Sequence, residues 1–420
     1  MDELRSEIRA AFETEQAAYP PAAELRRNLT VAAGSQPRQA PNIQWLAVAV
    51  AALLGILVVA GLMSTRLAHR VSVPVPAATP VTIPIADYGP PPAGVNLLYV
   101  MDPTNRSWLI GLDWTGKPRA TVKLAQPLAP NQQIAMAPDG QEFQVNDINS
   151  GGGGGRFLDR LGRPIPGGGV PGTASYVFGA GLGHGIWADD NRRFCSAVQN
   201  QHTFAWTLET QLPGQAPKTV TLVTREPGVR SIMEVVACSF RSDEAILVRT
   251  KANAEPAEMW VIRLSNGRVL SHSVYPIAQA IARVVASSDA TYVAESSGQS
   301  IGQVSPATVI RRVSDRSVVA TLAPNIAVLS FSGDDSLVLV STGPYGAWQP
   351  SVMEVIDVRS GRVIWRGTAA FGGVAAQPGG RGFALVDAAP GQDAVIGTIL
   401  MIHGDGSVTK FAGLYLPLWW

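Results

Sequence analysis

The chain repeats itself from residue 96 onwards with a period of 45 to 53 residues. One turn recurs six times, with an aspartate, or a glycine in the last copy, at its fourth position, and a short alternating apolar run follows. These positions are Asp139, Asp190, Asp243, Asp289, Asp334 and Gly379. A second turn has its third position at residues 116, 162, 214, 267, 316, 361 and 406, and all but one of these are glycine. Because Asn-Gly and Asp-Gly between β-rich runs are typical of hairpins, two turns per period predict four strands per unit.

Seven units of four short strands predict an all-β fold, a seven-bladed β-propeller spanning 96–420. The 42 glycines and 31 prolines agree with many strands joined by tight turns. The first unit has only three evident strands, so its innermost strand must come from elsewhere. Two donors are open: 414–420, in which Pro417 would remove one ladder hydrogen bond, and Val81–Ala86.

Some of these segments resemble known bacterial repeats. Residues 98–105 and 110–116 are similar to the repeat of YVTN-type propellers, and Ala137-Pro-Asp-Gly140 resembles the Ser-Pro-Asp-Gly turn of Tol-type propellers. The resemblance covers about 95–420. It implies the propeller architecture and not an activity, because propellers host both binding and catalysis.

An apolar segment precedes the repeats. No charged residue lies between Arg38 and Arg66, and Trp45–Met63 is apolar throughout. At about 1.5 Å per residue its length is roughly 28 Å, close to the hydrocarbon thickness of a bilayer. The sequence therefore predicts a transmembrane helix at 43–65, with a helical tail at 1–42 and a proline-rich linker at 66–95. The whole arrangement resembles uncharacterised bacterial envelope proteins and some anti-sigma-like regulators.

Basic residues indicate the orientation of this anchor. Arg26, Arg27 and Arg38 lie on its N-terminal side, against Arg66 and Arg70 on the other. The side richer in Lys and Arg normally stays in the cytoplasm. We therefore expect a single-pass protein of the bacterial plasma membrane with a cytoplasmic N-terminus and an extracytoplasmic propeller.

The tail has an apolar face, because Leu4, Ile8 and Phe12 recur at four-residue spacing. Two interpretations are open: this face binds a cytoplasmic protein, or the tail is loosely ordered beside the membrane. Leu4, Ile8 and Phe12 are therefore candidate partner-binding residues.

A second candidate binding region lies in the second unit. Gly151–Gly155 and Gly167–Gly169 flank an inserted segment that carries Arg156 and Arg160. No Gly-Lys-Ser/Thr follows either glycine run, so a phosphate-binding loop is not indicated. Because such loops often carry the contacts of a propeller, Arg156 and Arg160 are predicted to bind a partner.

Catalytic chemistry has weak support in the sequence. None of the five histidines stands at ligand spacing from another histidine, a cysteine or a carboxylate, so no metal, cofactor or catalytic residue is predicted. His184 with Asp189 and Asp190 would be the first residues to consider for catalysis, but a structural role is favoured. Cys195 and Cys238 could pair in an oxidising compartment or could be two small buried hydrophobic residues.

Three functional hypotheses follow. The expected one is a non-enzymatic module of the cell envelope that binds a protein or a cell-wall component, with the bilayer contacted through Trp45–Met63. The second is a transmembrane regulator whose propeller senses and whose tail binds a cytoplasmic partner, as a sigma factor would be bound. The third is a lactonase-like or cyclotransferase-like enzyme. A net charge of +1 with 15% charged residues gives no indication of nucleic acid binding.

Overall fold

The computed structural model divides the chain into two compact units, 1–73 and 74–420. The structure describes residues 80–102, 104–129, 132–147, 156–167, 185–199, 205–224, 231–251, 258–275, 283–296, 308–342, 350–388 and 396–415. The predicted tail, the transmembrane helix at 43–65 and the first part of the linker lie outside these ranges. Within them, no helix is long and apolar enough to cross a membrane.

The described residues form 25 strands in five sheets. The largest sheet has ten strands, in the order β19 (Ile326–Phe331), β20 (Leu337–Thr342), β21 (Pro350–Asp357), β22 (Val363–Ala376), β23 (Phe383–Ala388), β24 (Ile396–Ile402), β25 (Val408–Tyr415), β1 (Leu98–Asp102), β2 (Asn105–Leu112) and β3 (Pro118–Lys123). A three-stranded sheet contains β4 (Gln132–Met136), β5 (Glu142–Asp147) and β6 (Arg156–Asp159).

Three further sheets have four strands each. They contain β7 (Ile186–Trp187), β8 (Phe194–Gln199), β9 (Trp206–Gln211) and β10 (Lys218–Thr224); β11 (Ser231–Ser239), β12 (Glu244–Lys251), β13 (Glu258–Arg263) and β14 (Val269–Val274); and β15 (Arg283–Ala286), β16 (Tyr292–Ser296), β17 (Val309–Arg312) and β18 (Val318–Thr321). Consecutive strands of these sheets pair antiparallel.

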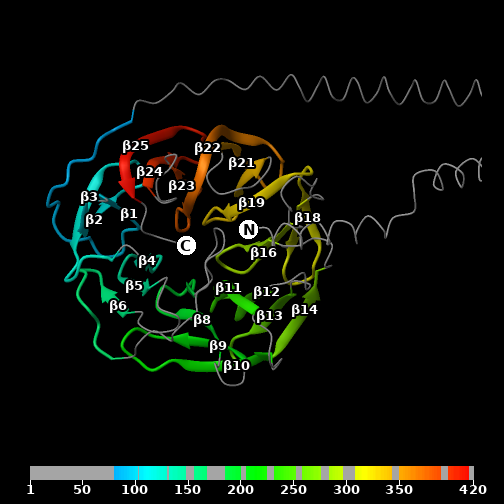
Figure 1. The fold of residues 1–420 in the computed structure, drawn as a ribbon. Coiled ribbons are helices and arrows are strands. Elements are labelled where there is room, and N and C mark those ends of the chain that lie inside the picture. Colours follow the sequence, from blue (N-terminus) through cyan, green and yellow to red (C-terminus); the bar gives the residue numbers. More distant parts are fainter. Residues whose placement is uncertain are drawn as a thin grey trace, which may run out of the picture. The chain divides into compact units, whose positions relative to one another are not determined.

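The sheets follow one another around a ring (Figure 1). The first strand of one sheet lies beside the first strand of the next, from β4 to β7, β11, β15 and β19. The three-stranded sheet and the three four-stranded sheets are antiparallel meanders that run outwards from this inner strand. The predicted all-β, propeller-like fold is therefore confirmed for the described part of the second unit.

Two long strands link neighbouring groups within the ten-stranded sheet. The first part of β22 pairs with β21, and from Phe371 onwards it pairs with β23. In the same way β25 pairs with β24, and its last residue, Tyr415, pairs with Met101 of β1. The C-terminal candidate for closing the first unit thus reaches β1, whereas Val81 pairs with Phe411 of β25. Residues 416–420 lie outside the described ranges.

The predicted turns are present between the strands. In the first turn of a unit the aspartate carboxylate accepts the backbone N–H two residues later, at 3.0 Å for Asp139 and Gln141 and at 2.8 Å for Asp289 and Thr291. Asp and Asn favour turns because their side chains replace such backbone hydrogen bonds. The strands expected after these turns correspond to β5, β8, β12, β16, β20 and β23.

The hydrophobic core lies between adjacent sheets. Trp206 and Trp260 belong to one cluster formed by β7–β10 and β11–β14, and Trp365 belongs to another. Each of the three is only 5% exposed. The tryptophans therefore fill space between sheets.

Candidate functional site

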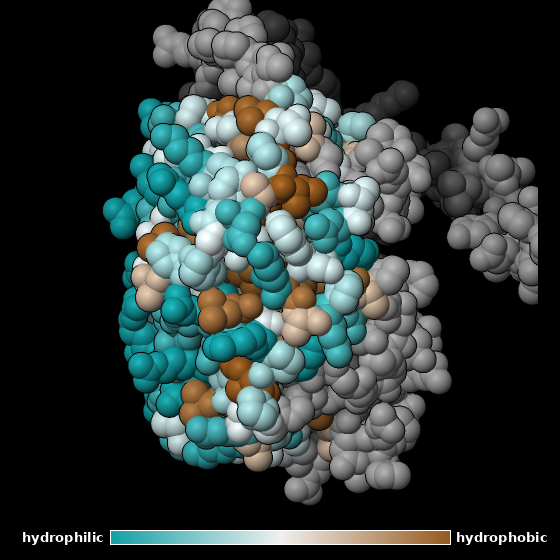
Figure 2. All heavy atoms as spheres, turned by 90° about the vertical axis from the view of Figure 1, so that its left-hand side faces the viewer, coloured by the Kyte–Doolittle hydropathy of each residue, from teal (hydrophilic) through white to brown (hydrophobic). Residues whose placement is uncertain are grey.

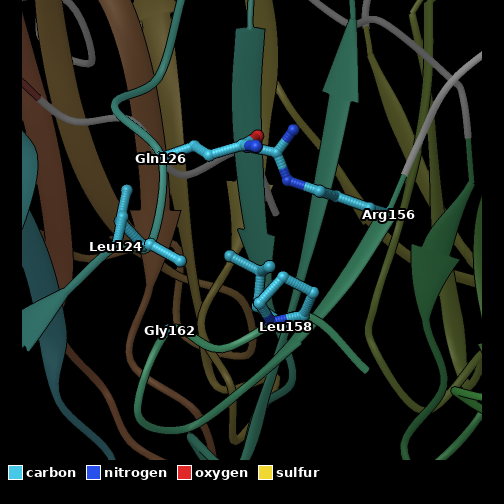
Figure 3. Close-up of a pocket in the computed structure, with 7 residues that line it drawn as sticks. Leu124, Gln126, Arg156, Leu158 and Gly162 are labelled. Atoms are coloured by element: carbon cyan, nitrogen blue, oxygen red, sulfur yellow. The ribbon is translucent and has the colours of Figure 1, made fainter. Parts of the chain in front are cut away.

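Arg156 lies at the edge of a small depression between two sheets. The depression is shallow and is lined by Leu124, Ala125, Gln126, Arg156, Leu158, Gly162 and Pro164. Figure 3 shows the side chains of Arg156 and Gln126 pointing toward each other, with Leu124 and Leu158 below them. Arg156 begins β6, and Gln126 follows β3. A guanidinium and an amide above an apolar floor can bind a carboxylate or a carbonyl oxygen.

Arg160 has a different environment. Its Nη1 donates a hydrogen bond of 2.6 Å to the carbonyl oxygen of Pro91. The side chain thereby holds the segment that precedes β1 against the turn after β6. The structure thus separates Arg160 from the depression that Arg156 lines, and the predicted partner-binding role of both residues stays a prediction.

The other three candidate residues, Leu4, Ile8 and Phe12, lie outside the described ranges, as does His184.

The surface on the left-hand side of Figure 1 is mostly hydrophilic, with small and separate hydrophobic patches where it is described (Figure 2). A partner that binds there would meet polar side chains over most of its contact area.

Cys195 and Cys238 form a disulfide that joins β8 to β11. Both residues are fully buried. The sequence left open whether the two cysteines pair, because their distance in space depends on how two sheets are placed. The disulfide therefore connects neighbouring sheets of the ring.

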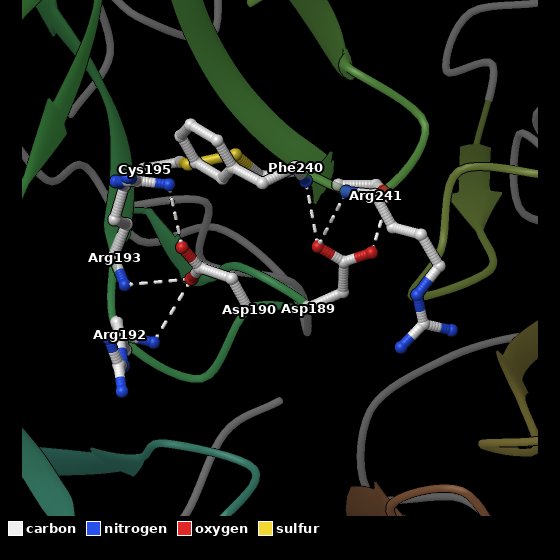
Figure 4. Close-up of a disulfide and its surroundings, with 9 residues drawn as sticks. Asp189, Asp190, Arg192, Arg193, Cys195, Phe240 and Arg241 are labelled. Carbon is white, nitrogen blue, oxygen red and sulfur yellow. Dashed lines mark hydrogen bonds and ion pairs between the residues drawn. A yellow bond between two sulfur atoms is a disulfide. The ribbon is translucent and has the colours of Figure 1, made fainter.

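Asp189 and Asp190 lie next to this disulfide and have separate roles (Figure 4). Asp189 Oδ2 accepts a hydrogen bond of 2.5 Å from Ser239 Oγ, and Asp189 Oδ1 accepts one of 2.7 Å from the backbone N–H of Phe240. These donors belong to the next sheet, at the end of β11. Asp190 instead accepts hydrogen bonds from the backbone N–H and the guanidinium of Arg193, within its own turn. Both carboxylates hold turns together, which favours the structural interpretation over the catalytic one.

Two other carboxyl groups have pKa values near neutrality. Burial and, next, the charge of Asp139 raise the pKa of Glu142 to about 7, although Arg192 opposes the shift. Burial and, next, the charge of Asp289 raise the pKa of Asp335 to about 8. Both residues stand in or directly after the first turn of a unit, and a second carboxylate nearby disfavours ionisation in each case.

A buried ionic group was missed by the sequence analysis. Glu258 forms an ion pair with Arg249, whose side chain is 3% exposed, and its second carboxylate oxygen lies 2.8 Å from Nε2 of His272, within hydrogen-bonding distance. The His272 ring stacks on Trp260 with centroids 4.8 Å apart. Strand register places Arg249 opposite Glu258 and His272 opposite Trp260. No turn pattern in the sequence marks this pairing, because residues 249 and 258 face each other only once β12 and β13 pair.

This group fixes an imidazole on the outer strand β14, where the side chain of His272 is 42% exposed. An oriented imidazole can exchange a hydrogen bond with a partner. Among the described residues, no group of three or more His, Cys, Asp or Glu side chains is arranged to hold a metal ion.

Comparisons with known proteins are distant. No protein-family model matches the chain, and no curated protein matches it. Among solved structures, TolB from Acinetobacter baumannii is 15% identical with a TM-score of 0.39 over 66% of this chain and 64% of that chain. Hydrazine synthase from Kuenenia stuttgartiensis is 13% identical with a TM-score of 0.45, over 79% and 99% of the two chains.

Prolyl oligopeptidase B from Galerina marginata is 11% identical with a TM-score of 0.46, over 76% of this chain. The match spans about half of that enzyme's length, 52%. At these identities and TM-scores the likeness carries no information about activity, and the fold assignment depends on the strand topology of the chain itself.

Proposed function

We propose that this chain is a single-pass protein of the bacterial plasma membrane whose extracytoplasmic β-propeller is a non-enzymatic binding module of the cell envelope. The observation that carries the proposal is the disulfide between Cys195 and Cys238. Disulfides form and persist in oxidising compartments and are rare in the cytosol. A propeller outside the cytoplasm agrees with this bond, with the apolar segment Trp45–Met63 and with the excess of arginine on its N-terminal side.

We further propose seven blades. β22 passes from β21 to β23 at Phe371, and β25 passes from β24 to β1 at Tyr415. Division at these two points separates the ten-stranded sheet into three groups. These three and the four other sheets support a count of seven.

The contacts of the charged side chains favour a binding function over a catalytic one. Asp189 and Asp190, the first residues to consider for catalysis, accept hydrogen bonds that hold turns and sheets. Arg156 and Gln126 instead face each other at the edge of a depression with an apolar floor. The partner is a protein or a cell-wall component that offers an oxygen acceptor at this edge.

The compartment can be tested directly with the full chain. Cells are quenched with acid, free thiols are labelled with a maleimide that adds mass, and the protein is analysed with and without prior reduction. We expect no labelling of Cys195 and Cys238 without reduction, and labelling of both after it. A matched variant lacking residues 43–65 should be labelled without reduction. Labelling of both cysteines in the unreduced full chain would place the propeller in the cytoplasm and overturn the proposal.

The regulator is the second candidate, favoured by the apolar face of Leu4, Ile8 and Phe12 in the tail. Cross-linkers placed within residues 1–40 should then capture a cytoplasmic protein. Replacement of Leu4, Ile8 and Phe12 by serine should abolish the capture. If capture is unchanged by the triple replacement, the tail does not bind through this face.

A further inference from the structure

The chain that precedes β1 crosses the outer side of the ring where the last described strand meets the first. Figure 1 shows this segment in blue, running from beside β25 to β3. It belongs to the later part of the predicted proline-rich linker, and we call residues 80–91 the strap. Its contacts bind it to three consecutive groups of strands.

The first contact of the strap is with β25. Val81 pairs parallel with Phe411, and its backbone N–H donates to the carbonyl oxygen of Lys410 at 2.8 Å. The backbone N–H of Ala412 donates in turn to the carbonyl oxygen of Val81 at 3.4 Å. Ile83 is 7% exposed and belongs to the same buried cluster as Phe411 and the apolar residues of β1. The strap therefore adds a side chain to the core where the last and first strands meet.

The second contact is with β3, and Thr121 is its centre. The backbone N–H of Thr121 donates to the carbonyl oxygen of Gly89 at 2.7 Å, and its hydroxyl donates to the carbonyl oxygen of Ala86 at 2.7 Å. The same hydroxyl oxygen accepts a hydrogen bond of 3.0 Å from the backbone N–H of Tyr88. Because β3 is the edge strand of its sheet, the strap supplies partners there that a neighbouring strand does not.

The third contact is the hydrogen bond of 2.6 Å from Arg160 to the carbonyl oxygen of Pro91. Arg160 lies in the turn after β6, in the next sheet along the ring. One segment thus joins the strands that end in β25, the strands β1–β3 and the sheet β4–β6.

Most of the strap lies at the surface. Among residues 80–90, Ile83 alone is buried, and Val81 is 50% exposed. The ion pair between Asp87 and Lys123 joins side chains that are each about half exposed, and such pairs add little stability. A segment with few buried apolar contacts opens at a lower free energy than the core strands of the same fold. The strap can therefore leave its place while the sheets stay folded.

We propose that residues 80–91 are a detachable strap that fastens the ring where its last strand meets its first. With the strap bound, β25, β3 and the turn after β6 are held together. When the strap leaves, Ile83 leaves the cluster that contains Phe411, and the pairing of Tyr415 with Met101 loses its support. The seam between β25 and β1 then opens.

The place of the strap in the chain gives this device its use. The strap is continuous in sequence with the part of the linker that leads to the predicted transmembrane segment at 43–65. A load that reaches the linker from its N-terminal side therefore acts on the strap before it acts on the ring. The fastening itself does not depend on the proposed compartment, so the test below can fail while the cysteine-labelling test succeeds, and the reverse.

The test is hydrogen–deuterium exchange of the full-length protein with two matched variants. Ile83→Ser removes the buried side chain of the strap, and Ile85→Ser changes an isoleucine that is 41% exposed. In Ile83→Ser we expect exchange to accelerate by about tenfold in β3, in β25 and at the pairing of Met101 with Tyr415. β12, which lies in a different sheet, should exchange as in the wild type. Ile85→Ser should resemble the wild type throughout.

A second variant releases the strap from its other end. Thr121→Val removes the hydroxyl that binds Ala86 and Tyr88 and keeps a β-branched side chain that suits a strand. If the strap detaches as one unit, this change at β3 should also accelerate exchange at Ala412 of β25.

A synthetic peptide of residues 78–93 then tests whether the place can be refilled. Added in excess to Ile83→Ser, the wild-type peptide should restore protection in β3 and β25, and the same peptide with Ile83→Ser should not.

The proposal is overturned if exchange at Met101 and Tyr415 stays at the wild-type rate in Ile83→Ser, or if Thr121→Val leaves Ala412 unchanged. Acceleration in every sheet, β12 included, would overturn it as well, because the strap would then be an inseparable part of the fold. Failure of the wild-type peptide to restore protection would show that the strap does not rebind.

Discussion

At the scale of single residues, adjacent positions in this chain have unrelated tasks. Asp189 and Asp190 are neighbours, yet Asp190 closes its own turn while Asp189 accepts hydrogen bonds from Ser239 and Phe240 in the next sheet. The repeat pattern correctly placed a turn at both residues. It could not tell them apart, because the donors to Asp189 lie about fifty residues away and approach only after two sheets pack.

Replacement of Asp189 by alanine should destabilise the protein by about 1–3 kcal/mol, because buried Ser239 and the N–H of Phe240 lose their acceptor. Urea unfolding of the full chain measures this free energy. Asp405, whose exposed carboxylate accepts hydrogen bonds from the backbone N–H and the hydroxyl of Ser407, is the matched control, and Asp405→Ala should cost about 1 kcal/mol or less. Equal losses for the two variants would show that the contact between sheets adds nothing.

Glycine at the second turn is required to a different degree in different units. Gly267 has φ +69°, and a Cβ there would lie 2.6 Å from the carbonyl oxygen of Val220. Gly361 has φ +66°, and a Cβ there would have no atom within 4 Å. Gly361→Ala should therefore cost about 1–2 kcal/mol for its backbone conformation alone.

Gly267→Ala should cost more than Gly361→Ala, because it adds a steric clash to the same backbone strain. Thermal unfolding of the two variants under identical conditions compares them. A melting temperature for Gly267→Ala equal to or above that of Gly361→Ala would contradict the clash.

At the scale of elements, the local pattern of residues determines where the strands lie. The links between sheets depend instead on how the sheets pack. The sequence predicted strands after each first turn, and β5, β8, β12, β16, β20 and β23 occupy those places. Alternation of apolar and polar residues is a local property of period two, so it is visible in the sequence. The pairing of Cys195 with Cys238 depends on β8 and β11 meeting across a seam, and the sequence left it undecided.

The Cys195→Ala/Cys238→Ala double variant should lose about 2–4 kcal/mol, because the cross-link closes a loop between residues 43 apart in sequence. Urea unfolding of the oxidised wild type and the double variant provides the comparison. Reduced wild-type protein should resemble the double variant. A variant as stable as the oxidised wild type would mean that the bond contributes nothing to the folded state.

At the scale of the whole molecule, the ring depends on contacts between residues far apart in the chain. Phe411 of β25 is 1% exposed and belongs to one cluster with Leu98 and Ile110 of β1 and β2. Tyr415 pairs with Met101 in the same region. The last described strand is thereby joined to the first.

Phe411→Ala should destabilise the protein by about 3–5 kcal/mol, because it opens a cavity where the first and last strands meet. Val318 on β18 is 54% exposed, and Val318→Ala should change the stability by about 0.5 kcal/mol or less. Chemical denaturation of both variants gives the two values. Comparable losses would show that Phe411 is not part of a closing core.

The sequence by itself determined the all-β class, the period of the repeat and the positions of turns and strands, because hairpin turns and alternation act over a few residues. Only the tertiary structure decided that Cys195 pairs with Cys238 and that Arg249 meets Glu258. It also separated Arg156, at the edge of a depression, from Arg160, which holds Pro91. These contacts join strands or sheets whose spacing in the chain leaves no local mark, and their energies arise only when packing removes water from between them.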